Sequence, residues 1–232
     1  MGTALSDGSF GGSDKDRYIN NLVHTLEAFN FQNGTGIELA GSTGGDILNN
    51  QVFDLLFDGS SGSNSYFILH GSSRTYNVMN NTCHFIDEGT DTGAVGSGIR
   101  ATGTASNATW SNNLVTDTYT SDYDTLAKAG TSETNMSSDT TGTSGLQSVN
   151  SVDQYLSNST PYDLRLKTGA DAFEAGTDKV VTPPLVNIDA TGRDRDAQAD
   201  TWSCGAHQLE TAVPSSNPPW RGNQARIFKQ RW

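Results

Sequence analysis

The chain has 232 residues and a formal net charge of −12, with 26 acidic and 14 basic residues. Glycine, serine, threonine and asparagine supply 96 of the residues, and because they form helices poorly, the composition argues against a helix-rich fold. The acidic balance argues against nucleic-acid binding by the body of the protein, and no apolar run approaches the length of a membrane span. No charged segment followed by an apolar one opens the chain, so we predict no signal peptide.

Pairs of consecutive asparagines recur along the first half of the chain. Successive pairs are 29, 31 and 32 residues apart, a spacing typical of stacked repeats. The pairs are Asn20-Asn21, Asn49-Asn50, Asn80-Asn81 and Asn112-Asn113. Asparagine tolerates left-handed backbone geometry at a bend, and its amide can bond to an identical neighbour. We therefore predict a structural asparagine ladder, stacked along one edge, formed by Asn20, Asn49, Asn80 and Asn112.

Apolar residues flank each pair at matching positions. Two residues before the pairs stand Tyr18, Ile47, Val78 and Trp110; two residues after them stand Val23, Val52, Cys83 and Val115; and further upstream stand Ile37, Ile68 and Ile99. The apolar residues alternate locally with polar ones between Gly, Ser and Asn turns, which favours short strands over helices. Coils of such strands, stacked about 4.8 Å apart, would place each set in one interior column.

One repeat reads Gly36-Ile37-Glu38-Leu39, followed by Asp46-Ile47-Leu48-Asn49-Asn50-Gln51-Val52-Phe53. It resembles a turn of the right-handed parallel β-helix of the pectate-lyase-like superfamily, and the resemblance covers residues 8–120. The resemblance implies an all-β fold, a right-handed parallel β-helix solenoid, over residues 1–145. Within that region, residues 116–145 break the register, and we expect a long loop or an irregular coil there.

A second resemblance covers residues 145–210. It rests on the runs 162–176 and 188–193 and on Cys204-Gly205-Ala206-His207-Gln208-Leu209-Glu210, which are similar to the C-terminal closing segment of phage and bacterial β-helix proteins of the choice-of-anchor type. In the first run Ala170-Asp171 replaces the usual Ser-Pro. We expect residues 146–210 to be an irregular closing segment of the same domain, followed by an extended tail over 211–232.

Candidate sites for chemistry are few. An acidic loop containing Asp87, Glu88 and Asp91 is a weak candidate for calcium, which needs several convergent oxygens; a solvated loop in an acidic protein is the stronger interpretation. We predict no metal site and no cofactor, and the histidines His24, His70, His84 and His207 lack metal-ligand spacing.

Catalytic groups are also hard to assemble from the sequence. A β-helix lyase needs a basic group, for which Arg74 and Arg100 are candidates, but each stands alone. A hydrolase needs paired carboxylates, and only Asp122 and Asp124 alternate suitably. We assign no catalytic residue. Cys83, in a column of valines, is predicted to be a small buried residue.

The last residues carry the opposite charge to the rest. Residues 211–232 contain four basic and no acidic residues, so they are +4, whereas residues 1–210, with 10 basic and 26 acidic residues, are −16. Prolines at 214, 218 and 219 predict an extended linker. The residues predicted to dock on a partner are Trp220, Arg221, Arg226, Phe228, Lys229, Arg231 and Trp232.

Three classes of function fit these features. The first is a non-catalytic structural protein of a phage virion, such as a capsid decoration, fibre or spike component, in contact with its own copies, other virion proteins or surface polysaccharide. The second is a polysaccharide lyase or glycoside hydrolase. The third is a module of a secreted bacterial surface protein. A fold type found mostly outside cells, on a chain that begins at Met1 without an export signal, favours a virion or extracellular location and the first class.

Overall fold

The structure, a computed structural model, describes most of the coiled part of the chain and portions of the C-terminal region. The described residues are 2–7, 16–29, 33–39, 44–58, 64–71, 74–87, 95–124, 129–178, 187–192, 194–195 and 202–207. None of the helices among these residues has the length and apolar character needed to cross a membrane.

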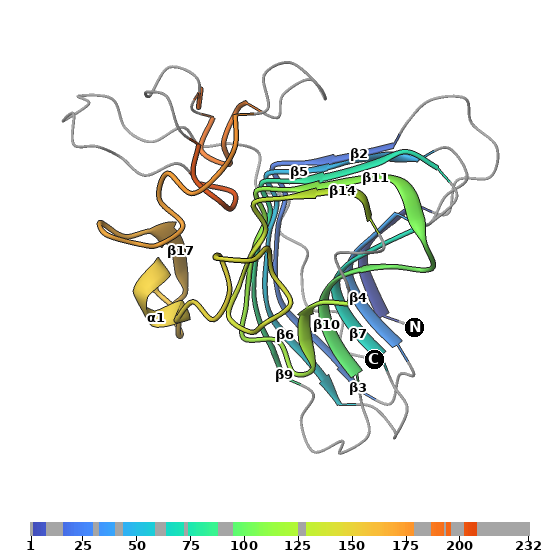
Figure 1. Cartoon of the computed structure of the whole chain (residues 1–232). Coiled ribbons are helices and arrows are strands. Elements are labelled where there is room, and N and C mark those ends of the chain that lie inside the picture. Colours follow the sequence, from blue (N-terminus) through green and yellow to red (C-terminus); the bar gives the residue numbers. More distant parts are fainter. Residues whose placement is uncertain are drawn as a thin grey trace.

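Three parallel five-stranded sheets form the coiled part, and successive strands of the chain enter successive sheets (Figure 1). Sheet A contains β1 (Gly2–Asp7), β4 (Asn33–Leu39), β7 (Asn64–His70), β10 (Val95–Ala101) and β13 (Ser121–Tyr123). Sheet B contains β2 (Asp16–Ile19), β5 (Gly45–Leu48), β8 (Tyr76–Met79), β11 (Ala105–Ser111) and β14 (Ala129–Glu133). Sheet C contains β3 (Leu22–Phe29), β6 (Gln51–Asp58), β9 (Thr82–Asp87), β12 (Leu114–Thr116) and β15 (Met136–Ser137). Each strand pairs with the strand three further along the chain, which is compatible with a β-helix-like solenoid.

The strand register confirms the three predicted interior columns. In sheet A, Ile68 lies opposite both Ile37 and Ile99. The other two columns follow the same rule in sheets B and C: Tyr18, Ile47, Val78 and Trp110 are in register, as are Val23, Val52, Cys83 and Val115. Most of these side chains have no exposed surface. Burying this apolar surface is the main force that favours stacking one coil on the next.

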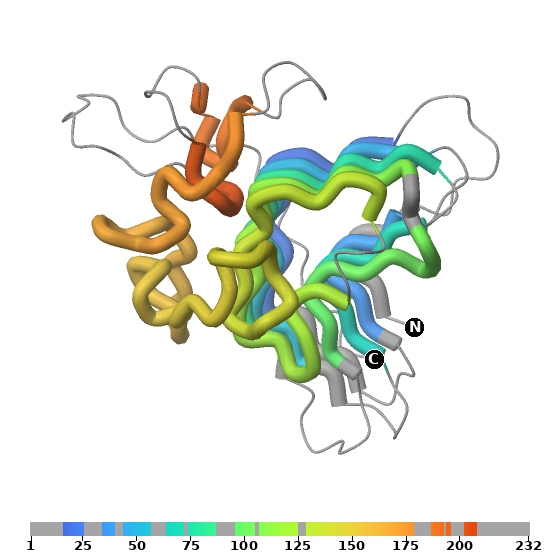
Figure 2. The backbone as a smooth tube through the Cα atoms, in the orientation of Figure 1, coloured from blue at the N-terminus to red at the C-terminus, as the bar shows by residue number. Residues whose placement is uncertain are grey.

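Residues 116–145 form a shortened fifth coil followed by a covering segment. Strands β13, β14 and β15 have three, five and two residues. Of the two predicted alternatives, a long loop and an irregular coil, the structure therefore shows the irregular coil. Residues 138–149 then cross the end of the stack (Figure 2). The backbone N–H of Tyr123 donates to Thr141 Oγ1 (2.9 Å), and that of Ser137 donates to the Leu146 carbonyl (3.0 Å). The chain itself therefore bonds to the C-terminal edges of sheets A and C.

The remaining described residues lie beside the coils (Figure 1). They include α1 (Ser151–Gln154) and an antiparallel pair, β16 (Tyr155–Ser157) and β17 (Asp163–Leu166). Residues 202–207 contact two coils, because the Gly205 N–H donates to the Asn112 carbonyl (2.7 Å) and the Ala206 N–H donates to Thr82 Oγ1 (2.8 Å). The described residues between 150 and 207 therefore lie along the side of the coils, and residues 138–149 bond to the last coil.

Candidate functional site

The two asparagines of each pair have different roles. The first one adopts left-handed backbone geometry, with φ between 54° and 56° at Asn20, Asn49, Asn80 and Asn112. This geometry turns the chain sharply from sheet B into sheet C. The backbone N–H groups of these residues donate to the following coil, which keeps the corners in line.

The hydrogen-bonded ladder runs through the second asparagine of each pair, one residue later than predicted. Its members are Asn21, Asn50, Asn81, Asn113 and Asn135, and each Nδ2 donates to the Oδ1 of the next at 3.0, 3.0, 2.9 and 2.8 Å. The spacing of the pairs indicated the ladder but could not show which amide points inward. The fifth member was missed because Thr134 replaces the first asparagine there.

The interior amides of the ladder are fully bonded. Asn81 Oδ1 accepts from the N–H (3.0 Å) and the Nδ2 (3.0 Å) of Asn50. Its Nδ2 donates to Asn113 Oδ1 (2.9 Å) and to the carbonyl of Ile47 (2.9 Å). A buried amide whose groups lack hydrogen-bond partners raises the free energy of the folded state. This ladder of fully hydrogen-bonded amides therefore stabilises only the correct stacking of the coils.

The first asparagines hold the lateral segment. Asn112 pairs with the backbone of Thr177 through both amide atoms: its Nδ2 donates to the Thr177 carbonyl (2.7 Å), and its Oδ1 accepts from the Thr177 N–H (2.8 Å). Asn49 Nδ2 donates to the Ile188 carbonyl (2.5 Å). Two members of the column predicted as the ladder thus hold the backbone at Thr177 and Ile188.

A buried arginine reinforces this attachment. Arg195 has no exposed surface, and its Nη2 donates to the Gly205 carbonyl (2.9 Å) and to Asn49 Oδ1 (3.3 Å). Its guanidinium also lies 5.8 Å from the centre of the Trp202 ring. Burial lowers the pKa of Arg195 to about 10, while the buried Asp189 carboxylate opposes that shift. Arg195 thus links Gly205 to Asn49 of the second coil.

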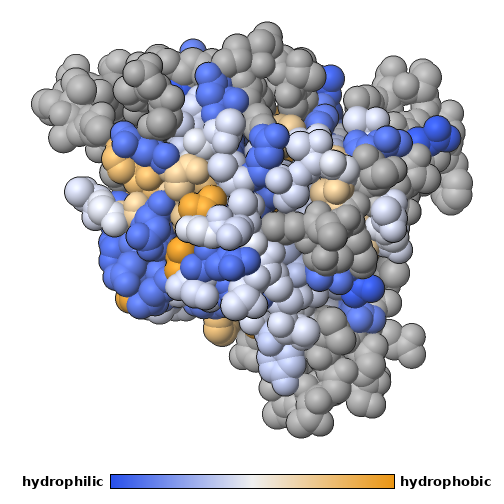
Figure 3. Space-filling view, viewed as in Figure 1, coloured by the Kyte–Doolittle hydropathy of each residue, from blue (hydrophilic) through white to orange (hydrophobic). Residues whose placement is uncertain are grey.

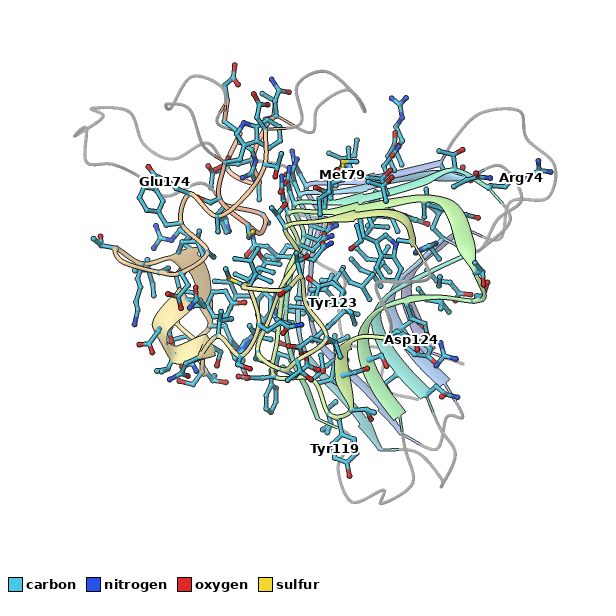
Figure 4. All side chains as sticks on the ribbon, viewed as in Figure 1. Arg74, Met79, Tyr119, Tyr123, Asp124 and Glu174 are labelled. Atoms are coloured by element: carbon cyan, nitrogen blue, oxygen red, sulfur yellow. The ribbon has the colours of Figure 1, made fainter. Side chains whose placement is uncertain are left out.

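The outer side of sheet A carries the candidate lyase arginine. Arg100 Nη1 donates to the hydroxyl of Tyr66 (2.8 Å), and Arg100 Nε lies 3.3 Å from Asp124 Oδ2. Asp124 and Arg74 lie at different corners of the coil, so Arg74 does not join this group (Figure 4). Arg100 is therefore a cation bound between a phenol and a carboxylate, which is a poor arrangement for a base.

The two candidate hydrolase carboxylates have separate partners. Asp122 is buried, and its Oδ2 accepts from the Ser138 N–H (2.5 Å), the Ser138 hydroxyl (2.7 Å) and the Asp139 N–H (3.2 Å). Burial raises the pKa of Asp122 to about 6, and the bonds from Ser138 oppose that shift. Asp122 thus fastens the covering segment to β13, whereas Asp124 pairs with Arg100.

The outer side of sheet C is covered by a group of rings. His24, Phe53 and His84 are in register, with His24 stacked on Phe53 at 5.1 Å between ring centres. Tyr162 lies against Phe53 and His84, at 5.3 and 5.7 Å. His84 Nε2 is 3.0 Å from the Asn158 carbonyl, and burial lowers its pKa. This group attaches the segment 155–166 to the coils.

The acidic calcium candidate is only partly described. The backbone of Asp87 ends β9, whereas Glu88 and Asp91 lie outside the described residues. Among the described residues no group of three or more His, Cys, Asp or Glu side chains is arranged to hold a metal ion. The predicted docking tail, 220–232, also lies outside them.

His70 is a neutral histidine in the core. It has no exposed surface, and Trp110 Nε1 donates to its Nε2 (2.8 Å), which leaves Nδ1 to donate to the Gly71 carbonyl (2.6 Å). Both ring nitrogens are occupied in the neutral form, and protonation would break the bond from Trp110. Burial lowers the pKa of His70 to about 4.

No known protein family, curated protein or solved structure matches the chain.

Replacing Asn81 with alanine should destabilise the coils by about 3 kcal/mol or more, because the Asn50 amide and the Ile47 carbonyl lose buried partners. The measurement is the urea midpoint, followed by far-UV circular dichroism. Asn20→Gly is the matched control, since Asn20 is exposed and outside the ladder and glycine adopts the left-handed φ of this corner; its effect should stay below about 1 kcal/mol. Equal effects of the two substitutions would contradict the ladder assignment.

Acid should destabilise the protein through His70. Its folded pKa of about 4 lies below the ordinary 6.5, so the stabilisation is complete above pH 6.5 and is lost as the pH falls from 6.5 to 4, by about 3 kcal/mol. Urea unfolding at pH 7 and pH 4.5 measures this loss. His70→Gln should reduce the pH dependence by about one proton. His70→Leu should lower stability at pH 7 yet show the same reduction, and an unchanged slope in both variants would contradict the assignment.

Proposed function

We propose that this chain is a non-catalytic structural protein of a phage virion, such as a capsid decoration, fibre or spike component. We further propose that its coils form a right-handed parallel β-helix of the pectate-lyase-like type. The observation that supports a structural role is how the candidate reactive groups are used. Arg100 is bound to Tyr66 and Asp124, and the Asp122 carboxylate accepts hydrogen bonds from the segment that covers the last coil.

Exposed aromatic rings support a contact with surface polysaccharide. Phe85 is 36% exposed and Tyr119 is 54% exposed. Aromatic faces flanked by polar groups suit sugar rings, whose C–H faces are apolar and whose edges carry hydroxyls. The apolar surface seen in Figure 3 gathers over the lateral part that contains α1 and β17, where Val152 and Leu156 are half exposed.

A carbohydrate-active enzyme is the second candidate, because an arginine and a carboxylate lie together outside sheet A. The side chains of Arg100 and Asp124 are 32% and 23% exposed, so a substrate could reach both. Against it stands the bond between them, which a lyase mechanism using Arg100 would have to break.

Turnover assays separate the two candidates. We expect no release of reducing ends or unsaturated products from polyuronates or capsular polysaccharides, since Arg100, Asp122 and Asp124 are bonded to other groups. Arg100→Ala and Asp87→Ala are the control variants. Robust turnover that either substitution abolishes would overturn the structural proposal in favour of the enzyme.

The basic tail is proposed to dock on another chain. Deleting residues 214–232 should leave the circular dichroism of the coils unchanged. It should remove the assembly that the tail makes, because the +4 charge and the three aromatic residues that bind the acidic surface of another chain are then absent. Sedimentation at low and high salt measures this, with tail-dependent assembly weakening as salt rises. A truncated protein that assembles normally would contradict the proposal.

A further inference from the structure

The two ends of the stack are built differently. At the C-terminal end, residues 138–149 satisfy the last coil. Asp139 Oδ2, Thr141 Oγ1 and Thr143 Oγ1 each accept a backbone N–H of the fifth coil at 2.9 Å. The ladder also ends there with a partner, because Asn135 Nδ2 donates to Ser132 Oγ (3.0 Å).

At the N-terminal end, the first strand of each sheet pairs on one side only with the strands that the structure describes. β1, β2 and β3 are the terminal strands of sheets A, B and C, and they present edges of six, four and eight residues. An edge of this length carries a row of backbone groups that another strand can pair with.

The ladder is incomplete at the same end. Asn21 donates its N–H (2.9 Å) and its Nδ2 (3.0 Å) to Asn50 Oδ1. Each later ladder amide also accepts two bonds at Oδ1 and donates to a carbonyl of the preceding coil, as Asn50 does to Tyr18 (2.9 Å). Within the described part of the chain, Asn21 makes neither of these bonds. Its amide therefore presents one acceptor and one donor hydrogen toward the N-terminal side.

We propose that the N-terminal edge pairs with the same edge of a second copy of this chain. An amide that offers both a donor and an acceptor is complementary to itself, so the two Asn21 side chains can bond reciprocally across a two-fold axis. Such an axis, perpendicular to the stack, sets the edge strands antiparallel, which is a stable form of pairing.

The covered end makes the association stop at two copies. A head-to-tail stack would need a free C-terminal edge, and residues 138–149 bond to the last strands of sheets A and C at that edge. The interface is therefore a closed dimer and not a filament. It is independent of the proposed virion function and of the tail.

Salt distinguishes this contact from docking of the tail. Each copy carries a net charge of −12, so added salt screens the repulsion between copies and should strengthen the edge dimer. Tail docking is an attraction between opposite charges and should weaken under the same change. The experiment can therefore disprove the edge dimer without disproving the docking of the tail, and the reverse.

The experiment is sedimentation velocity on the full chain at several concentrations, at about 50 and about 500 mM NaCl, a range over which screening changes strongly. We expect a species of twice 24.7 kDa that becomes more abundant with salt. Asn21→Asp places two carboxylates face to face and should weaken the dimer at least about ten-fold, a change of about 1.4 kcal/mol. Asn20→Asp, which adds the same charge one residue earlier, should leave it within about two-fold.

If the Asn21→Asp variant folds poorly, hydrogen exchange on the unmodified protein provides a second test of the edge dimer. In the unmodified protein, amides of β3 should become better protected as concentration rises, whereas those of β15 should not change. A monomer at all concentrations and salts would overturn the inference. So would a dimer that is unaffected by Asn21→Asp and leaves β3 exchange independent of concentration.

Discussion

The asparagine ladder, at one corner of the coils, fixes the register of each coil on the next. An amide removed from water costs free energy unless both its oxygen and its N–H groups find partners. Asn50, Asn81 and Asn113 find them in the neighbouring coils, at separations of 22 to 35 residues. The apolar columns could tolerate a shift in the register of one coil on the next. The asparagine ladder cannot, because such a shift would leave several buried amides without hydrogen-bond partners.

The asparagine pair performs two tasks because its members point in opposite directions. The left-handed residue turns the chain and presents its amide outward, where Asn49 and Asn112 hold the backbone of the lateral segment. The following residue points inward and forms the ladder. A sharp, repeated corner therefore organises both the interior of the stack and the attachment of Thr177 and Ile188, and Arg195 adds a bond between Asn49 and Gly205 to this attachment.

Several polar side chains that were candidates for chemistry instead hold parts of the fold together. Asp122 joins the last coil to its cover, His84 joins the coils to the segment 155–166, and Arg100 links Tyr66 to Asp124. Groups bonded in this way are held in one position, which suits a rigid surface for assembly. A catalyst needs groups left free to exchange protons, and the side chains of Arg100, Asp122 and Asp124 are bonded to other groups.

The sequence alone determined the strands, their spacing and the interior columns, because a repeat of about 30 residues carries local alternation that each coil satisfies in the same way. It could not determine which member of each asparagine pair points inward, since that depends on the left-handed φ at the corner, which two identical neighbours do not reveal. It also could not place residues 138–149 against the last coil, or Thr177, Ile188 and residues 202–206 along the side. Those positions rest on contacts such as Asn112 with Thr177, 65 residues apart, and on burial of Arg195, which only the assembled tertiary structure provides.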